Sequence, residues 1–372
     1  MSAVEVLAVR TPAELDRFIR LPARLYGNDP SFIPPLLLER KESLSPRKNP
    51  YFQHAEAQFF LATRGGRDVG RISAQVDRLA RDAEGHFGLI AAEDDAQVFA
   101  ALFEAAEGWL RARGCTRVVG PFNLSINEES GLLVDGFDTP PMLLMAHDPR
   151  YAGPRIEACG YAKAKDTLAY LYDVEQGLPR SALRLIDERR PARLTVRNLD
   201  ARQYLEEFDR ITAIFNDAWS GNWGFIPFTE AEIRHMAKSM KPLVHPELVA
   251  IAELDRKPIG FGVLLPNLNE AIADFDGRLM PFNWLKLLLR LKRTRTGRVP
   301  LMGIRRSHNG GVMGGLIAFL IIDRLREGAR RRGMQKVELS WILEDNWPMR
   351  RVIESLGAAP YKTYRLYEKV IA

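Results

Sequence analysis

The feature of this sequence that most restricts its fold is an order of strands and helices that occurs twice. In the first half, a short apolar run precedes a helical pattern with Thr11 as N-cap and Glu14 three residues later. A turn at Gly65-Gly66, a long helix that stops at Gly114 and a buried strand complete this half. The expected elements are strand 4–9, helix 12–20, strands 58–63, 69–76 and 86–90, helix 97–113 and strand 116–120.

The second half repeats this order and ends like the first. The segment Arg155–Gly160 (R-I-E-A-C-G) resembles Val352–Gly357 (V-I-E-S-L-G), and each precedes a tyrosine-rich strand. This agreement indicates a duplication. It predicts an α/β fold with mixed (α+β) sheets, a first domain over 1–178, a linker over 179–192 and a second domain over 193–372. The expected elements of the second half are strand 194–199, helix 201–219, strands 248–254, 258–265 and 299–304, helix 313–332 and strand 336–341.

The composition is that of an ordinary globular chain. A length of 372 residues favours two domains, and 46% hydrophobic with 27% charged residues argues against disorder. Two cysteines, Cys115 and Cys159, cannot build a disulfide framework, and no Cys/His spacing resembles a zinc site, so we expect no metal. No signal peptide or membrane-spanning run is recognisable, which predicts a cytoplasmic protein.

Positive charge is concentrated in one stretch. The net charge is +6, but Lys286–Arg306 holds eight Lys or Arg and no Asp or Glu. Such a segment favours an anionic partner, either phosphates, an acidic carrier protein or a lipid surface, and the alternative is a solvated basic face.

A glycine-rich turn between a strand and a long helix follows this basic stretch. It exposes consecutive backbone N–H groups at the positive end of a helix dipole, an arrangement that binds phosphate. Its spacing matches neither the Walker pattern nor the dinucleotide fingerprint, and the alternative is a helix packed closely on a sheet. The candidate residues are Ile304, Arg305, Arg306, Asn309, Gly310, Gly311, Met313, Gly314 and Gly315.

Four features occur together: the order β-α-α-β-β-β-α-β-α-β, this loop, Asn346 after the next strand and a helix ending in Leu356-Gly357. In combination they resemble the GNAT acyltransferase superfamily. The resemblance implies that the loop binds the pyrophosphate of acyl-CoA as co-substrate. Ile353 stands where many members have a tyrosine acid, which leaves the proton donor to the thiolate open. The equivalent first-half loop, Ala91–Asp95, has three carboxylates and no glycine and would repel pyrophosphate. We therefore expect a degenerate first repeat and acyl-CoA binding by the second repeat.

The segment Gly120–Gly131, with Trp223–Phe228, resembles a subgroup of tandem GNAT proteins that includes bacterial ceramide synthases. The alternative for Gly120–Gly131 is a turn network. The resemblance implies N-acylation of a sphingoid base, 3-ketosphinganine or sphinganine, to a ceramide-type amide. It places Phe122, Asn123, Asn127, Trp223 and Phe225 among the substrate-binding residues.

Amide formation needs a neutral amine and a polarised thioester carbonyl. In the GNAT manner, a backbone N–H of Val299–Arg305 would polarise the carbonyl for direct attack. The candidates for accepting the amine proton are Glu128, Glu344 and His147, each with a structural role as the alternative. We expect Asn127 and Glu128 to share one acceptor site with Glu344 and Asn346.

Met280–Arg295 has an amphipathic pattern. Such a helix can lie on an anionic membrane with Trp284 at the headgroup level, or it can cover the protein core. The alternative functions are an aminoacyl or peptidyl transferase with a tRNA-bound donor, and a silent regulator that binds acyl-CoA or lipid. We expect no nucleic acid partner for the ceramide-forming function, whose donor is acyl-CoA or an acyl carrier protein.

Overall fold

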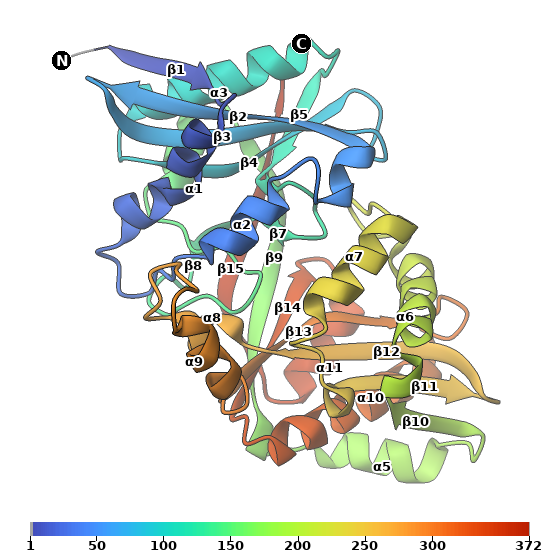
Figure 1. Cartoon of the computed structure of the whole chain (residues 1–372). Helices are drawn as coiled ribbons and strands as arrows, with labels where there is room; N and C mark the ends of the chain where they lie inside the picture. The colour runs from blue at the N-terminus through green and yellow to red at the C-terminus, as the bar shows by residue number, and fades with distance from the viewer. Residues whose placement is uncertain (1–2, 372) are drawn as a thin grey trace. The chain divides into compact units, whose positions relative to one another are not determined.

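The computed structural model describes residues 3–371. The chain forms two compact units (Figure 1). The first comprises Met1–Thr167, Ile272–Leu285 and Lys362–Ala372, and the second comprises Leu168–Ala271 and Lys286–Tyr361. Both are α/β with mixed sheets, so the predicted fold class is confirmed.

The sheet of the first unit is antiparallel except for one parallel pair, β4 with β5. A separate hairpin is formed by β6 and β7, and β8 pairs with β15. In spatial order the strands are β1 (Val4–Ala8), β2 (Ala55–Arg64), β3 (Arg67–Asp77), β4 (Glu84–Ala92), β5 (Arg117–Gly120) and β15 (Ala359–Val370), with β6 (Phe122–Asn123), β7 (Glu129–Ser130) and β8 (Leu132–Asp135) apart.

Helices cover both faces of this sheet. On one face α3 packs over β1–β3 (Figure 1). Val98 and Leu102 of α3 lie directly over Gly70 of β3. The other face carries α1, whose Phe18 packs on Phe59. The predicted capping box of Thr11 and Glu14 is confirmed. The helices are α1 (Pro12–Tyr26), α2 (Leu37–Ser43), the 3-10 helix η1 (Pro50–Gln53), α3 (Ala96–Arg111) and α4 (Ala152–Ala158).

The second unit has the same plan. Its strands are antiparallel from β10 to β13, while β13 and β14 run parallel. On one face Ile317 and Ile321 of α10 fill the space left by Gly260 and Gly262 of β12. In spatial order the strands are β9 (Ala162–Asp173, of which Leu168–Asp173 belong to this unit), β14 (Lys336–Leu343), β13 (Thr296–Ile304), β12 (Lys257–Pro266), β11 (Val249–Leu254) and β10 (Leu194–Asn198).

The other face of this sheet is covered by α6, which lies on β12 and β13. Helix α7 and the short α2 of the first unit fall in stretches where the sequence predicted no element. None of the helices within residues 3–371 is long and apolar enough to cross a membrane. The helices of the second unit are η2 (Val174–Gln176), α5 (Arg180–Arg189), η3 (Ala201–Gln203), α6 (Tyr204–Trp219), α7 (Glu230–Met240), η4 (Pro246–Leu248), α8 (Leu268–Ile272), α9 (Asn283–Arg290, which straddles the unit boundary), α10 (Gly311–Arg331) and α11 (Trp347–Ser355).

Each unit contains part of the closing strand of the other half of the sequence. In the first unit β15 pairs with β5, in the register Tyr367↔Gly120. In the second unit β9 neighbours β14, and Val174 N–H at its end donates to Gln335 O at 3.0 Å. The compact units are therefore not continuous in sequence, and the division at residues 179–192 stays a prediction about the repeats.

Candidate functional site

The strand pair β13 and β14 separates part-way along its length. Their parallel pairing ends at Val299↔Leu339, while β13 continues to Ile304 beside β12. The register of β13 on β12 changes from Leu301 to Arg298 over two residues of β12, so a bulge lies at Val299-Pro300. Proline has no N–H to extend a ladder. Beyond the bulge, one edge of β13 is left without a neighbouring strand among the described residues.

That edge offers backbone groups to a ligand. Arg305 N–H donates to Ile259 O of β12 at 2.8 Å. Because the backbone N–H groups of successive residues point to alternate sides of a strand, those of Ile304 and Met302 point away from β12. The indole of Trp219 donates to the carbonyl of Met302 at 3.1 Å. The N–H of Ile304 is therefore directed to the open side, where a thioester carbonyl could accept it.

The helix after this strand begins without a side-chain cap. The N-cap of α10 is Gly310, and its first N–H groups have no acceptor within the helix. A Cβ added at Gly310, Gly311 or Gly315 would meet nothing within 4 Å, whereas one at Gly314 would lie 2.2 Å from Asn309 O. Gly311 also has a φ of 58°. Gly314 thus allows a tight turn, and the other three glycines border open space that suits phosphate oxygens.

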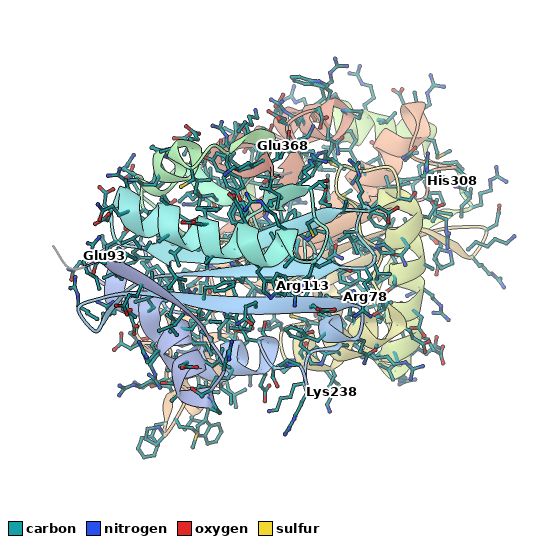
Figure 2. All side chains as sticks on the ribbon, turned by 90° about the horizontal axis from the view of Figure 1, so that it is seen from above. Arg78, Glu93, Arg113, Lys238, His308 and Glu368 are labelled. Carbon is teal, nitrogen blue, oxygen red and sulfur yellow. The ribbon has the colours of Figure 1, made fainter. Side chains whose placement is uncertain are left out.

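Two arginines stand at the mouth of this loop. Arg305 Nε donates to Pro258 O at 3.1 Å, which fixes its side chain against β12. Arg306 is exposed, and its backbone N–H donates to Asp217 at 2.8 Å. His308 contacts Ser307 Oγ at 2.8 Å and lies at the surface (Figure 2). The described residues contain no group of three or more His, Cys, Asp or Glu side chains placed to hold a metal ion.

The equivalent strand of the first unit, β4, has the same bulge but a closed edge. Its register on β3 shifts at Leu89-Ile90. Asn123 Oδ1 accepts the Leu89 N–H at 2.7 Å. Ala92 N–H donates to Tyr26 Oη at 3.0 Å, and Tyr151 Oη donates to Ala92 O at 2.6 Å. Side chains of the protein thus take the positions that a cofactor could use.

The helix that follows β4 is capped by a carboxylate. Asp95 accepts from the N–H groups of Gln97 and Val98 at the start of α3. Arg64 pairs with Asp95 at 2.7 Å, and Glu93 and Asp94 pair with Arg67 and Arg155. Figure 2 labels Glu93 at the surface. A carboxylate therefore lies where a phosphate would have to bind.

Glu128 lies at the turn of the β6–β7 hairpin in the first unit. Its backbone N–H donates to Ser125 O at 3.1 Å. Burial raises the pKa of the Glu128 carboxyl to about 8, Arg40 opposes this rise, and Glu39 and Glu129 add to it. The side chain can therefore hold or release a proton near neutral pH.

Glu129, the next residue, has a pKa held below its usual value. Burial alone would raise its pKa, but the ion pair with Arg40 at 2.7 Å and the hydrogen bond from Asn123 Nδ2 at 2.7 Å lower it overall. Both polar atoms of the Asn123 side chain are thus engaged inside the first unit.

His147 is a buried residue of the first unit. Its Nε2 lies 2.8 Å from Asp29 Oδ2. Burial lowers the pKa of His147, and Asp29 partly opposes this. The imidazole is therefore oriented by a carboxylate, as a proton-transferring histidine would be, and its catalytic role stays a prediction.

Asn346 and Glu344 follow β14 in the second unit. Asn346 caps α11 by accepting from Met349 N–H at 3.3 Å, and the backbone carbonyl of Glu344 accepts from Arg350 at 2.7 Å. Both contacts organise the loop that leads out of β14. Glu344 and Glu128 belong to different compact units, so the predicted shared acceptor site stays a prediction.

The predicted substrate-binding residues fall into two groups. Phe122 is buried in the first unit and contacts His86 edge-on, while Asn127 N–H donates to Ser125 Oγ at 3.2 Å. In the second unit, Phe225 lies 5.9 Å from Phe215, ring centre to ring centre. Trp223 is half-buried. The Phe215 ring also packs at a tilt against Trp219 and Phe228, and the Trp219 indole donates to Met302 O, so aromatic side chains gather beside β13.

Sequence reasoning missed a buried charged cluster where β13 and β14 separate. Arg298 and Glu338 are almost completely buried, 3.4 Å apart, and Ser340 bridges them with hydrogen bonds of 2.8 and 2.7 Å. Tyr361 donates to the other oxygen of Glu338. The signal was present, because Glu338 and Ser340 alternate with apolar residues in a strand buried on both faces.

The chain is similar to two curated bacterial proteins along almost its whole length. It is 53% identical to the "Bacterial ceramide synthase" of Caulobacter vibrioides over 99% of this chain and 98% of that one. It is 47% identical to "Protein YghO" of Escherichia coli over 96% and 93% of the two chains. No protein-family model matches.

Solved structures show the same fold at low identity. A tandem GNAT protein from the clavulanic acid biosynthesis pathway superposes with a TM-score of 0.58 at 13% identity, covering 99% of both chains. A GCN5-related N-acetyltransferase from Sphaerobacter thermophilus gives 0.55 at 15% identity, covering 99% of this chain and 96% of the other. The predicted tandem GNAT fold is confirmed.

Proposed function

Because this chain belongs to the family of the bacterial ceramide synthase of Caulobacter vibrioides, we propose that it transfers a long-chain acyl group from acyl-CoA to the primary amine of a sphingoid base. The acceptor is 3-ketosphinganine or sphinganine, and the product is a ceramide-type amide. The observation that carries the proposal is the contrast between the open β13–α10 junction and its closed counterpart in the first unit.

The donor binds at the second unit. The uncapped start of α10 and the open space at Gly310, Gly311 and Gly315 suit the pyrophosphate of CoA. The pantetheine then follows the edge of β13, with Ile304 N–H available to the thioester oxygen. An acyl carrier protein presents the same pantetheine thioester and is the alternative donor.

The reaction is a direct displacement. The ammonium first gives one proton to a base, for which we propose Glu128, and the neutral nitrogen attacks the thioester carbon. The C–S bond breaks as the C–N bond forms, and CoA leaves as a thiolate. The second proton of the nitrogen is lost and the thiolate becomes protonated. No covalent enzyme intermediate is required, so positioning supplies much of the rate.

Helix α9 supports a position at the membrane surface. None of its residues is buried, and Trp284 and Leu289 are 45% and 59% exposed, with Phe282 just before it at 73%. A helix covering a core would bury such side chains. At 3.6 residues per turn, Lys286 and Arg290 fall on the opposite side of α9 from Leu285 and Leu288. We propose that the helix rests on anionic lipid of the inner membrane, where long-chain substrates are found.

A purified-protein screen tests this function. Acyl-CoAs of increasing chain length, and one acyl carrier protein thioester, are incubated with 3-ketosphinganine, sphinganine and a short alkylamine. Amides are read by mass spectrometry, and free CoA by a thiol reagent. We expect amide and thiol in equal amounts with the sphingoid bases. Thiol release without amide, or amide only with the short amine, would reject the proposal.

A further inference from the structure

The first unit connects the closed edge of β4 to the carboxylate at the tip of the β6–β7 hairpin. Asn123 receives the Leu89 N–H on its oxygen and gives its amide hydrogen to Glu129, both at 2.7 Å. Gln75, buried in β3, donates to Phe122 O at 2.7 Å and to Leu124 O at 3.2 Å. The base of the hairpin is thus held on both sides of Asn123 by interior polar groups.

The chain of contacts continues from Glu129 to Glu128. Arg40 of α2 is buried and donates to Glu129 at 2.7 Å, and its charge also acts on Glu128. Arg40 and Glu129 therefore act on the Glu128 carboxyl with opposite signs. Asn123 sets the orientation of Glu129 and so influences that balance.

From this geometry we infer that Asn123 is a positioning residue that sets the ionisation of Glu128 through Glu129 and Arg40. This inference rests on the proposed role of Glu128 in accepting the amine proton. The closed edge of the first unit is then part of the acceptor chemistry, since the bond to Leu89 N–H fixes the asparagine that organises the carboxylates.

The charges around Glu128 determine whether a substitution should raise or lower its pKa. Glu39 and Glu129 raise the pKa of Glu128, Arg40 lowers it, and Asn49 lowers it by a hydrogen bond. Farther out, Arg71 of β3 lowers the pKa of Glu129, and Glu129 raises the pKa of Asp148. An added negative charge at position 123 should therefore raise the pKa of Glu128, and removing the charge of Glu129 should lower it.

Two variants test the inference with opposite signs. Asn123→Asp keeps an oxygen for Leu89 N–H but adds a charge and loses the donor to Glu129. Glu129→Gln keeps an acceptor for Asn123 and Arg40 but removes a charge. Because ionised Glu128 is the active form, the rate rises with pH through its pKa. We expect the midpoint of kcat/KM against pH to move up in Asn123→Asp and down in Glu129→Gln, with the KM for acyl-CoA unchanged. Gln97→Glu, an added charge on exposed α3, should leave the midpoint in place.

A second measurement does not depend on turnover. Protein labelled with ¹³C in the glutamate carboxyls is titrated by NMR, and Glu128→Gln identifies the signal that titrates near pH 8. One outcome is that the signal shifts in opposite directions in the two variants although the wild-type protein makes no amide. That result would support the inference and reject the proposed function. Equal midpoints in wild type and both variants, in an enzyme that does make amide, would reject the inference alone.

Discussion

The two strand–helix junctions of this chain, β4–α3 and β13–α10, share one backbone plan and differ in what occupies it. Both have a parallel neighbour that ends early and a bulge in the same place, at Leu89-Ile90 and at Val299-Pro300. In the first unit Asn123, Tyr26 and Asp95 complete the junction from within. In the second unit, within the described residues, β13 has no neighbouring strand on that edge beyond the bulge, and α10 begins without a side-chain cap. A strand–helix junction can therefore keep its fold while protein side chains occupy the backbone groups that would otherwise bind a ligand.

The same substitution in the two helices gives the strongest test of this comparison. Gly315→Leu in α10 adds a side chain where the protein leaves open space, without the positive φ that complicates Gly311. Loss of two charge-assisted hydrogen bonds to phosphate should weaken acyl-CoA binding by about 100-fold or more. Gly108→Leu in α3 meets equally open space and is the control. Calorimetry measures both, and equal affinities for acyl-CoA would show that α10 does not bind the phosphates.

Glu128→Gln tests whether the first unit acts in proton transfer while the second unit binds acyl-CoA. We expect kcat to fall about 100-fold, in the range that a positioned base contributes, while the acyl-CoA dissociation constant is unchanged. The control is Glu56→Gln, a surface carboxylate of the same unit that pairs with Arg78 and Arg113, both labelled in Figure 2. Steady-state kinetics with full activity in Glu128→Gln would leave the first unit without a role in proton transfer.

The exposed helices α9 and α5 both carry arginines and can be compared for binding to anionic lipid. In α9 and the residues after it, Lys286→Glu with Arg293→Glu should weaken binding to anionic vesicles about 30-fold, since each cation near the surface contributes ~1 kcal/mol. Arg290 is left intact because it donates to Ala271 O. Arg184→Glu with Arg189→Glu in α5 reverses as many charges on a helix with one exposed leucine. If both pairs reduce sedimentation equally, general electrostatics and not α9 directs the protein to lipid.

The smallest expected effect concerns the cap of α3. Asp95→Ala removes the side chain that accepts from Gln97 and Val98 N–H, which should lower the free energy of unfolding by about 1 kcal/mol. It should not create a second acyl-CoA site, because Asn123 and Tyr26 still close the edge of β4. Chemical denaturation and calorimetric stoichiometry check the two parts. A stoichiometry of two would show that the carboxylate alone excludes CoA.

Local signals were sufficient for most of the element order. Thr11 and Glu14 act on neighbouring backbone groups, and Gly114 and Gly333 end their helices with φ values of 80° and 73°, so short windows of sequence reveal them. The contrast between the acidic loop after β4 and the glycine-rich loop after β13 could also be predicted from the sequence.

The contacts around Asn123 in the first unit and around Arg298 in the second unit join residues that are far apart in the sequence. Asn123 is 34 residues from Leu89, and Ser340 is 42 residues from Arg298. The role of Asn123 depends on β5 lying beside β4, which periodicity does not specify. The buried Arg298–Glu338 pair could have been suspected from alternation in β14, but its partner Tyr361 lies on another strand. Pairing between distant strands, and not the identity of the strands, was the missing information.

The exchange of closing strands has a consequence for how the chain is made. As the polypeptide leaves the ribosome, the first unit lacks β15, so β5 and β8 present an unpaired border until the second unit has been synthesised. The second unit, by contrast, has β9 from the outset. We expect the nascent first unit to need a chaperone, and a chain severed between the repeats to yield two aggregation-prone fragments that regain solubility only when expressed together.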